Sequence, residues 1–571
     1  MVQFGTIELH GGKIVISIPI ENSEPQIIPI VSKQFIPGDK VGLSKSGDVV
    51  LIERKEQSAI AVVKSIDNKV ATLYIANLGP SCPFAPELTF NEIALKIGDR
   101  LVIWLHSNGT ISSKGIYSND PLDDVPCLLR MYNLYKKQTS HNSTKQTPLY
   151  TDDSIVCHDN LNTFTIDPAS SVDFDDAISV DIENRTIYIH IVDIAHEESE
   201  KHITDTRLSD LCLSLYLSNE HTEHLLDVKT ASDTLSLVKD EQRRVITVMV
   251  ILNEYGMVHH HDIYRSTIIV KNRWSYEQVA HMLKMDNCPK ELKYLVNLTN
   301  KRSEDVKYHI NLPSVRFHVN TDSGNIDDLH IESTNDDAHA LIATAMVLAN
   351  LVVSKHLEYC NIKLPNRFHD SLRGLSNPSF KTTNNDLVDS FILVKRYARA
   401  CYSVDKKGHF GLGLTDYVHF TSPMRRYADV LVHRILAGYQ YDQMTLESEV
   451  DWLNHRSQVV RSIQDLYTNW KIVRHVQSII TKNSEQIFDI WITDVKKGGV
   501  LWFMPSLSLN GFAHVSTLKP TQFWYFDQLK NTLQGSEQNK LTISIGKQYK
   551  ATITSIDPIT HVLNLSITVN I

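Results

Sequence analysis

Residues 165–181, TIDPASSVDFDDAISVD, crowd acidic side chains into a stretch that otherwise has the alternating pattern of β-strands. The acids are Asp167, Asp173, Asp175, Asp176 and Asp181. Like charges held this close repel each other, so a folded chain keeps them together only when something compensates the repulsion. On this stretch alone, three interpretations are open: a solvated turn before a hairpin, a catalytic metal site, and a structural calcium site.

The calcium interpretation can be tested against the EF-hand template, which requires Gly at its sixth position and Glu at its twelfth. Counted from Asp173, those positions hold Ile178 and Asn184, so the template fails. Mg²⁺, by contrast, prefers a few carboxylate oxygens and keeps positions open for water and a substrate phosphate. Several acids together could hold two such ions about 4 Å apart, an arrangement that cleaves phosphodiesters. The following segment, 177–196, is predicted to form two strands joined at Glu183 and Asn184.

A second motif, HFGLGLTDYVHFTSPMRRYADVLVHRIL at residues 409–436, combines a predicted helix start with two arginines. Ser422 is a favourable N-cap and the proline after it suits the first helical position, so a helix is expected to begin here. Arg425 and Arg426 then fall in the first turn, where the helix dipole disfavours cations unless an anion binds there. The alternative is an i,i+4 ion pair of Arg425 with Asp429 on a hydrated surface. A bound anion would supply the phosphate site that a catalytic metal needs.

Taken together, the two motifs resemble the signatures of the RNB family of exoribonucleases, which includes bacterial ribonucleases II and R and the catalytic subunit of the eukaryotic exosome. The resemblance extends to HIVDIAH, SLVKDEQRRVITVMV and IYRSTIIVKNRWSYEQV, and is strongest from 164 to 436. It implies a processive, hydrolytic 3′-to-5′ exoribonuclease that degrades single-stranded RNA to nucleoside 5′-monophosphates. The implied cofactor is Mg²⁺, with Mn²⁺ as the alternative.

The resemblance also implies roles for individual residues. Asp175 matches the aspartate regarded as most directly catalytic, and Tyr276 in RWSYEQV matches an aromatic residue that stacks against RNA bases. Asp181 lies outside the family's set of four aspartates and is assigned to the hairpin. The implied metal ligands are Asp167, Asp173, Asp175 and Asp176; the implied catalytic residues are Asp175, Arg425 and Arg426; and the implied RNA-binding residues are Tyr276, Arg425 and Arg426.

The chain departs from the family pattern at several positions. Lys363 and Leu364 stand where some members carry a second stacking aromatic residue, and Gln464 aligns with a functional glutamate of the bacterial enzymes. Ala343 and Thr344 stand where relatives often have acids. These departures leave an alternative function: a catalytically impaired RNA-binding protein that retains the RNB fold. They also leave the final product length open.

At 571 residues the chain is too long for one hydrophobic core, so several domains are expected. The expected fold class is multidomain α+β, in which small OB-type β-barrels flank a central mixed α/β RNB catalytic domain. Long helices are predicted at 338–357, 387–403 and 447–480, and the stretch 118–160 is predicted to be a linker or surface excursion. The predicted domains are a cold-shock-type OB barrel (1–56), a second OB barrel (57–120), a linker with the RNB domain (121–482) and a C-terminal OB-fold domain (483–571).

OB folds bind single strands by stacking bases on aromatic side chains. In the C-terminal barrel Trp502, Phe503 and Phe512 are candidates for this role, although each is equally consistent with a core position.

Composition and charge narrow the class of protein. With 42% hydrophobic and 22% charged residues, the chain has the composition of a soluble globular protein. The formal net charge of −9 is a weak argument against a nucleic-acid partner, because an acidic metal site adds negative charge of its own. The seven cysteines form no CxxC pair, which fits a reducing compartment.

No secretory signal and no membrane span are expected from the sequence, so no membrane partner is predicted. The expected location is the cytoplasm, with an organelle as the alternative. The expected state is a monomer or a subunit of an RNA-decay complex.

Overall fold

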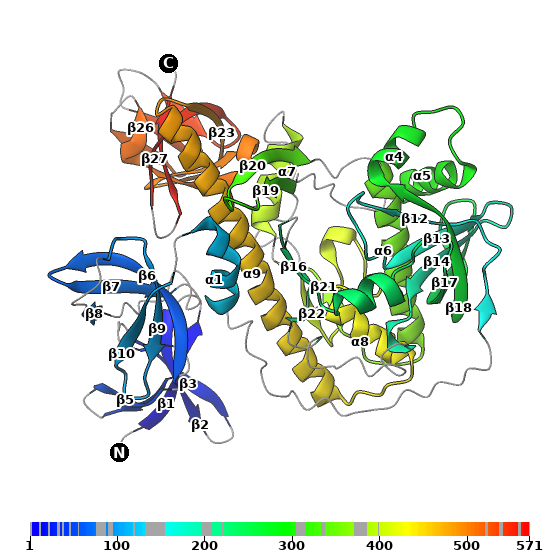
Figure 1. Ribbon diagram of the computed structural model, residues 1–571, viewed down its shortest axis with the longest axis horizontal. Coiled ribbons are helices and arrows are strands. Elements are labelled where there is room, and N and C mark those ends of the chain that lie inside the picture. Colours follow the sequence, from blue (N-terminus) through cyan, green and yellow to red (C-terminus); the bar gives the residue numbers. More distant parts are fainter. Residues whose placement is uncertain are drawn as a thin grey trace.

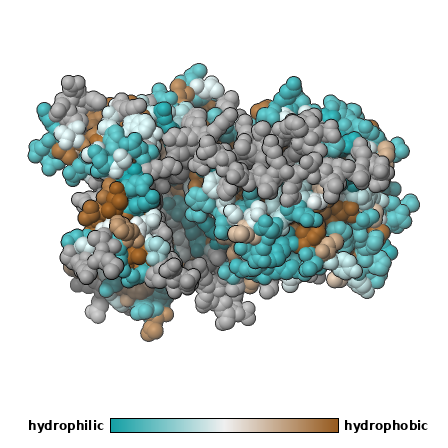
Figure 2. Space-filling model, turned by 90° about the horizontal axis from the view of Figure 1, so that it is seen from below, coloured by the Kyte–Doolittle hydropathy of each residue, from teal (hydrophilic) through white to brown (hydrophobic). Residues whose placement is uncertain are grey.

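Strand-rich units at both ends of the chain flank a larger mixed α/β unit in the computed structural model (Figure 1). On the face shown in Figure 2, hydrophilic residues predominate among the described atoms, and apolar residues form separate patches. The predicted fold class, multidomain α+β, is confirmed. The described residues are 3–10, 13–20, 23–30, 35–36, 39–44, 47–54, 56–75, 87–89, 95–117, 120–131, 155–196, 208, 211–218, 221–303, 314–332, 337–370, 385–397, 399–519, 523–535, 541–557 and 561–569.

Two five-stranded sheets follow each other at the N-terminal end, with strand orders β3-β2-β1-β4-β5 and β10-β9-β6-β7-β8. Each has its own apolar core, which includes Ile16 and Val41 in the first sheet and Val63 and Ile103 in the second. The strands are β1 (Gln3–His10), β2 (Lys13–Ile20), β3 (Ser23–Pro29), β4 (Lys40–Leu43), β5 (Val49–Glu53), β6 (Gln57–Asp67), β7 (Val70–Ile75), β8 (Glu87–Thr89), β9 (Arg100–Leu105) and β10 (Ile111–Ile116).

The central unit is built on a six-stranded sheet of order β11-β18-β12-β13-β14-β17. Because β17 also pairs with β18, the sheet closes on itself. The predicted hairpin is confirmed, since β13 pairs with β14 from Asp176↔Ile191 to Asp181↔Thr186. The strands are β11 (Val156–Cys157), β12 (Thr163–Asp167), β13 (Asp176–Asp181), β14 (Thr186–Val192), β17 (Gln242–Leu252) and β18 (Val258–Ser275), with smaller pairs β15 (Leu215–Ser218) and β16 (His221–Glu223), β19 (Ser314–Val319) and β20 (Ile326–Glu332), and β21 (Asn366–Phe368) and β22 (Cys401–Ser403).

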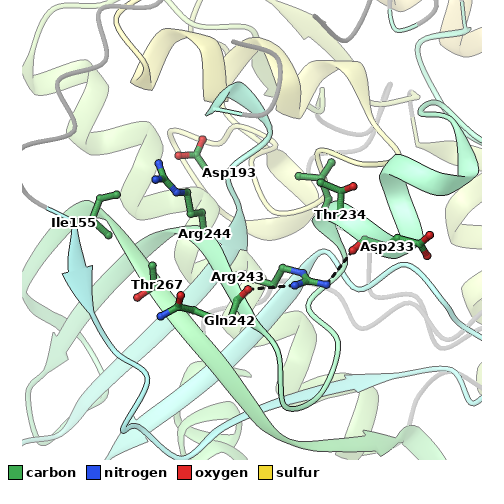
Figure 3. A pocket seen from close by; sticks show the side chains of 9 residues that line it. Ile155, Asp193, Asp233, Thr234, Gln242, Arg243, Arg244 and Thr267 are labelled. Carbon is green, nitrogen blue, oxygen red and sulfur yellow. Dashed lines mark hydrogen bonds between the residues drawn. The ribbon is translucent and has the colours of Figure 1, made fainter. Parts of the chain in front are cut away.

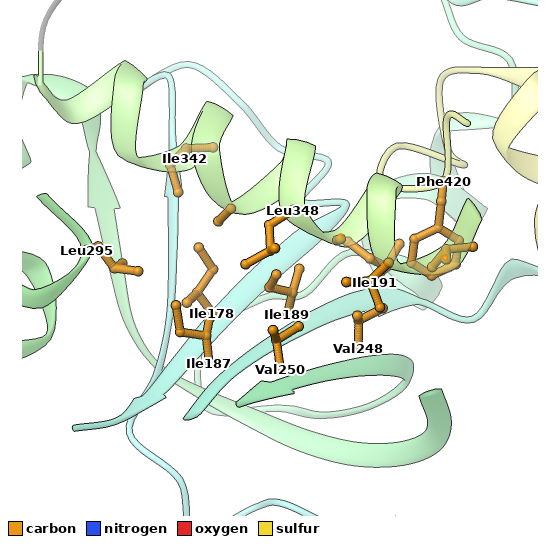
Figure 4. Packing of buried hydrophobic residues seen from close by; sticks show 14 of the residues in the cluster. Ile178, Ile187, Ile189, Ile191, Val248, Val250, Leu295, Ile342, Leu348 and Phe420 are labelled. Carbon is orange, nitrogen blue, oxygen red and sulfur yellow. The ribbon is translucent and has the colours of Figure 1, made fainter. Parts of the chain in front are cut away.

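Helix α6 (Asp337–Tyr359) covers one face of this sheet, as Figure 4 shows. Its Ile342 and Leu348 pack in one apolar cluster with strand residues that include Ile189 and Val250. Each such side chain contributes about 1.5–3 kcal/mol when fully buried. By length and composition α6 is apolar enough to cross a membrane, so the expectation that no segment offers such an apolar run is wrong. In the structure its apolar residues form the core of the central unit instead.

The long helix α9 (Gln443–Lys482) runs from the central unit past α1 to the C-terminal sheet (Figure 1). Asp124, the first residue of α1 (Asp124–Met131), is fully buried and forms ion pairs with Lys471 and Arg474 of α9. It also pairs with Arg100 of β9, so this carboxylate ties the second N-terminal sheet to α9. The other helices are α4 (Tyr276–Met282), α5 (Lys290–Ser303), α7 (Asp386–Arg396) and α8 (Tyr427–Leu436), with short turns η2 (Pro121–Asp123), η3 (Thr230–Leu235), η4 (Phe410–Leu412), η5 (Pro505–Leu507) and η6 (Val515–Thr517).

Two predicted boundaries differ from the structure. Helix α1 lies inside the stretch assigned to a linker, so that interpretation is wrong for residues 124–131, while 132–154 fall outside the described residues. The helix predicted at 387–403 ends at Arg396, because Tyr397 is extended and the chain then enters β22. The helices predicted at 338–357 and 447–480 are confirmed as α6 and α9.

The C-terminal unit has a six-stranded sheet of order β25-β24-β23-β30-β31-β26 and a three-stranded sheet of order β27-β28-β29. Trp502 and Phe503 are each 1% exposed, and the Phe503 ring stacks on Phe391 of α7, so neither can serve as a stacking platform. Phe512 is 42% exposed and remains available for this role. The strands are β23 (Ile487–Lys496), β24 (Gly499–Met504), β25 (Leu509–His514), β26 (Leu518–Lys519), β27 (Trp524–Asp527), β28 (Thr532–Gly535), β29 (Thr542–Ser544), β30 (Gln548–Ile556) and β31 (Leu563–Thr568).

Candidate active site

The acidic stretch links two neighbouring strands of the central sheet. Asp167 is the last residue of β12, and Asp176 is the first residue of β13, which pairs with β12. The intervening loop, residues 168–175, therefore returns Asp173 and Asp175 to the same end of the sheet. Asp181 lies at the far end of β13, where its side chain accepts hydrogen bonds from the Asn184 backbone and side chain. The assignment of Asp181 to the hairpin is thus confirmed.

Asp175 is the acid that contacts the second motif. Its Oδ1 accepts a 2.9 Å hydrogen bond from the backbone N–H of Met424, and its Oδ2 lies 3.7 Å from Nε of Arg425. The backbone carbonyl of Asp175 accepts a hydrogen bond from the N–H of Val192, which fixes the residue at the end of the β13–β14 pair. The fold therefore brings together two motifs that lie far apart in the sequence.

Burial and mutual repulsion raise the pKa values of three of the acids, Asp167, Asp175 and Asp176. Burial raises the pKa of Asp175 to about 8, against the lowering effect of the Arg425 guanidinium. Burial and the charge of Asp167 raise the pKa of Asp176 to about 8. Burial and the charge of Asp175 raise the pKa of Asp167 to about 7. A cation placed among these carboxyls would stabilise their ionised forms.

The oxygen atoms of these acids suit a divalent cation. Oδ2 of Asp167 is buried without a hydrogen-bond partner in the described part of the chain, and such an atom is costly unless a cation or donor meets it. Among the described residues, no three His, Cys, Asp or Glu side chains converge as a complete ligand set. Mg²⁺ commonly uses one or two carboxylates and completes its shell with water and substrate phosphate. The residues therefore fit an open cation site, not a closed protein cage.

Arg425 and Arg426 lie in the turn before α8, not in its first turn. Helix α8 begins at Tyr427 with Arg426 as its N-cap, so the predicted helix start at Ser422 is wrong. The cause is Asp429, whose Oδ1 accepts hydrogen bonds of 2.8 Å from the Ser422 N–H and from Nη2 of Arg426. The Asp429 carboxylate, within the helix, thus stabilises a turn at the residues where Ser422 was expected to cap the helix.

The two arginines have different environments. The Arg425 side chain is 47% exposed and faces Asp175, whereas the Arg426 side chain is 19% exposed and pairs with fully buried Asp429. Although burial lowers the pKa of Arg426, the charge of Asp429 raises it above its ordinary value. The predicted surface pair between Arg425 and Asp429 does not form, because Arg426 takes that carboxylate.

Backbone pairing holds this turn against the central unit. The N–H of Tyr427 donates to the carbonyl of Cys212, and the N–H of Ser214 donates to the carbonyl of Arg425. The segment before β15 therefore supports the turn that carries the arginines.

Tyr276 is placed beside the acids by strand pairing. The register of β12 and β18 sets Asp167 opposite Ser275, and Tyr276 follows as the first residue of α4. The Tyr276 ring stacks on the ring of His339 from α6, with centroids 3.8 Å apart and planes 8° apart. One face of Tyr276 is therefore covered within the protein.

Comparison with known proteins identifies the central unit. The RNB domain family matches residues 158–442, about half of the chain, and the match includes both motifs and Tyr276. The chain belongs to the RNB domain family. Ribonuclease R of Chlamydia pneumoniae is 24% identical over 575 residues, which cover 90% of this chain and 84% of that protein. Ribonuclease R of Thermotoga maritima is 26% identical over 448 residues, which cover 69% of this chain and 62% of that protein.

Solved structures share the fold of this RNB protein. Mycoplasma genitalium RNase R in complex with ribose-methylated single-stranded RNA matches with a TM-score of 0.75 at 19% identity, covering 99% of this chain and 100% of that one. Yeast Ssd1, described as a pseudonuclease, matches with a TM-score of 0.66 at 16% identity, covering 93% of this chain and 81% of that one. A ribonuclease and a pseudonuclease thus share the architecture, so the fold alone does not decide whether an RNB protein turns over RNA.

The departures from the RNB pattern have structural partners of their own. Lys363 donates a hydrogen bond to Oε1 of Gln443, the first residue of α9, and Leu364 is buried. Gln464 of α9 donates a 3.2 Å hydrogen bond to the carbonyl of Tyr216. Ala343 is exposed on α6 and Thr344, next to it, is partly exposed.

Tyr216 of β15 is a site residue that the sequence did not indicate. It is 43% exposed, yet burial and then the charge of Asp173 raise the pKa of its phenol to about 12, while Arg425 lowers it. The surrounding segment alternates like an ordinary strand and carries no charge, so nothing in it signals a site. Only the pairing of the preceding residues with the arginine turn places this phenol beside the RNB acids.

A polar cavity of about 540 Å³ lies elsewhere in the RNB unit, against β17 and β18 (Figure 3). On its wall Arg243 donates hydrogen bonds to the carbonyls of Asp233 and Gln242. None of the predicted site residues lines this cavity. It is therefore separate from the candidate active site.

Proposed function

We propose that this chain is a processive, hydrolytic 3′-to-5′ exoribonuclease that degrades single-stranded RNA to nucleoside 5′-monophosphates in RNA decay or processing. The observation that carries the proposal is the contact between the motifs, in which Asp175 lies 3.7 Å from Arg425. Phosphodiester hydrolysis needs acidic ligands for a metal and a cation for the phosphate, and this contact brings both to one point.

The proposed roles follow from exposure and neighbours. Arg425, half-exposed beside Asp175, neutralises the charge that develops on the scissile phosphate. Arg426 orients the same turn through its pair with Asp429 and contacts RNA with its remaining surface. Tyr276 offers a ring for base stacking, supported from behind by His339.

Asp167, Asp173, Asp175 and Asp176 would hold Mg²⁺, or Mn²⁺ in its place. When bound, such an ion supplies an activated water and neutralises charge on the phosphate. The unpaired Oδ2 of Asp167 and the raised pKa values of the buried acids support this assignment. Asp175 positions the reacting region through its hydrogen bond from Met424.

The proposed partner is single-stranded RNA, in agreement with the structure of Mycoplasma genitalium RNase R bound to such a strand. The same protein was also solved with double-stranded RNA, which makes structured RNA a substrate to test. The protein is proposed to act in the cytoplasm, with an organelle as the alternative, as a monomer or within an RNA-decay complex.

A catalytically impaired RNA-binding protein is the second candidate function. It is favoured by the departures at Lys363 and Gln464 and by the existence of a pseudonuclease with this fold. The buried, mutually repelling acids favour the enzyme, because a site that only binds RNA has no need to retain them.

The deciding experiment uses 5′-labelled single-stranded RNA with Mg²⁺ and compares the wild type with Asp175→Asn. The wild type should shorten the labelled RNA progressively and release nucleoside 5′-monophosphates. Asp175→Asn should bind the RNA without shortening it. Asp181→Asn is the matched control, because Asp181 belongs to the exposed hairpin. Tight binding without shortening by the wild type would favour the binding protein. Early internal fragments would contradict the 3′ exonuclease, and equal cleavage of DNA would contradict the RNA assignment.

A further inference from the structure

The loop that carries the acids, residues 168–175, is held by two side chains that have no proposed part in the chemistry. They are Ser236, which follows the turn η3, and Arg273 on β18. Both form hydrogen bonds with backbone atoms of the loop, and Arg273 also lies over the Phe174 ring, so the two residues constrain the path of the loop. A loop with several repelling carboxylates needs such constraints to keep one arrangement.

Ser236 holds the residues on either side of Asp173. Its fully buried Oγ donates a 3.0 Å hydrogen bond to the carbonyl of Val172 and accepts a 3.0 Å hydrogen bond from the N–H of Phe174. The next residue, Leu237, donates through its N–H to the carbonyl of Phe174 at 3.1 Å. The backbone at Asp173 is therefore fixed at both neighbours.

Ser236 is itself held in place by a π-helical turn. Its N–H donates to the carbonyl of Ala231 within η3, and its carbonyl accepts a 3.1 Å hydrogen bond from Nε of Arg243. Arg243 also donates 2.9 Å to the carbonyl of Asp233, as Figure 3 shows. Single π-turns are rare and occur often at functional sites. Here the turn delivers one hydroxyl to the acidic loop.

Arg273 holds the first half of the same loop from the opposite strand. The residue lies opposite Thr165 in the β12–β18 pairing, and its Nη2 donates to the carbonyls of Ala169 at 3.2 Å and Ser171 at 2.9 Å. Its guanidinium carbon also lies 4.7 Å from the centroid of the Phe174 ring. Arg273 thus connects the start of the loop with the residue that Ser236 binds at its end.

We propose that Ser236 and Arg273 are positioning residues that form a two-sided clamp on the acidic loop and thereby set the affinity of the acids for a divalent cation. The clamp fixes the loop that separates Asp167 from Asp173 and Asp175. This inference rests on the proposed function only in that it takes the acids to bind a cation. Residues behind metal ligands commonly change metal affinity or activity by about 10–100-fold when they are replaced.

The test compares Ser236→Ala, Arg273→Ala and Arg273→Lys with matched controls in the full-length protein. Ser232→Ala is the control for Ser236, because the Ser232 hydroxyl donates within its own turn to the carbonyl of Val228. Lys271→Ala is the control for Arg273, since it removes a positive charge from the same strand. Arg273→Lys keeps the charge and can still donate to a carbonyl, but its shorter side chain has no planar guanidinium to lie over the Phe174 ring.

The first readout is hydrogen–deuterium exchange of a peptide covering 168–176 in metal-free protein. We expect Ser236→Ala to accelerate exchange at Phe174 about fivefold or more, because its amide loses its acceptor. The second readout is Mn²⁺ binding followed by electron paramagnetic resonance. We expect binding about 10–100-fold weaker in Ser236→Ala and Arg273→Ala, a smaller loss in Arg273→Lys, and wild-type affinity in both controls.

Kinetics give a third readout, in which a positioning role should lower kcat and leave the KM for RNA unchanged. Unaltered loop exchange and Mn²⁺ affinity in both alanine variants would overturn the clamp, as would equal losses in the controls. If an alanine variant fails to fold, Arg273→Lys and the wild type provide the comparison. A wild type that binds Mn²⁺ through a clamped loop but never shortens RNA would refute the proposed function and leave the clamp standing.

Discussion

Adjacent residues of one turn can have separate functions when one of them pairs with a buried charge. Arg425 and Arg426 follow each other in the sequence, and the family resemblance treats them as a pair. In the structure Arg425 faces Asp175 and solvent, while Arg426 pairs with the buried Asp429. The difference arises because Asp429 has no other cation to compensate its burial among the contacts that the structure records. The two substitutions should therefore have different consequences.

Replacing Arg425 with alanine should lower kcat by about 100-fold or more and leave the Tm unchanged, because its role is to stabilise charge in the transition state. Arg426→Ala should lower the free energy of unfolding by about 3–5 kcal/mol, because it leaves the Asp429 carboxylate buried and unpaired. Single-turnover RNA shortening and urea denaturation measure the two effects. Equal losses of stability in the two variants would contradict the assignment.

The acids give the metal-free protein a predictable response to pH. The folded-state pKa values of Asp175 and Asp176, about 8 each, exceed the unfolded value of about 3.9, so the native state binds more protons in this range. These groups therefore stabilise the fold fully below about pH 4, and this contribution is lost as the pH rises through about 8. Mg²⁺ should raise the Tm more at about pH 8.5 than at about pH 6, because it compensates the ionised carboxylates. Scanning fluorimetry with and without Mg²⁺ measures the difference, and equal shifts at both pH values would contradict it.

At the scale of elements, α9 joins three units of the molecule through one buried carboxylate. Asp124 pairs with Arg100, Lys471 and Arg474, and Lys471 also donates to the carbonyl of Gly324 before β20. Buried ion pairs contribute little net stability, but removal of one partner is costly because the others remain buried and uncompensated. The cluster should therefore hold the second N-terminal sheet in place.

Replacing Asp124 with asparagine should destabilise the protein by about 3–5 kcal/mol and loosen the contact between α1 and α9. Burial raises the pKa of the neighbouring Cys127 thiol to about 11, so this thiol should be inert in the wild type and react once the contact opens. Thiol titration with a chromogenic disulfide measures the change, with exposed Cys157 and Cys360 as internal standards. Asp123→Asn is the matched control. An unreactive Cys127 in Asp124→Asn would show that the cluster does not hold this interface.

Helices and strands that their own hydrophobic pattern indicates could be predicted. Those whose presence or bounds depend on contacts with other parts of the chain could not. The helix α6 follows from a long run that is apolar nearly all round, and the hairpin after Asp176 follows from the alternation of its own residues. The start of α8 does not, because Asp429 reaches back to the Ser422 backbone and outcompetes the expected cap. The short helix α1 was missed because its amphipathic pattern lies inside a polar stretch and is stabilised by packing against α9.

For the whole molecule, the site could be predicted where the residue types in its motifs themselves indicate the chemistry. Acids and arginines are conspicuous in a sequence, and their contact through Asp175 and Arg425 follows the resemblance. Tyr216 was not predictable, because its proximity to Asp173 depends on the tertiary pairing of two loops. Trp502 and Phe503 show the converse, because the sequence alone does not tell whether an aromatic residue lies on a binding surface or in the core. In the structure both are buried.

The net charge of −9 limits how strongly the whole molecule can hold RNA by charge alone, so stacking on exposed rings should matter for long strands. In an Asp175→Asn background, Phe512→Ala should weaken binding of an RNA of about 20 nucleotides by about 5–150-fold, the loss expected for one stacked base. We expect an RNA of about 5 nucleotides to occupy the central site alone and therefore to bind equally well to both forms. Fluorescence anisotropy at fixed salt measures both affinities. Tyr255→Ala, which removes a 70% exposed ring from the turn between β17 and β18, is the control. Equal losses for short and long RNA would place Phe512 at the active site or in the core, and no loss for either would exclude the C-terminal barrel face as a stacking surface.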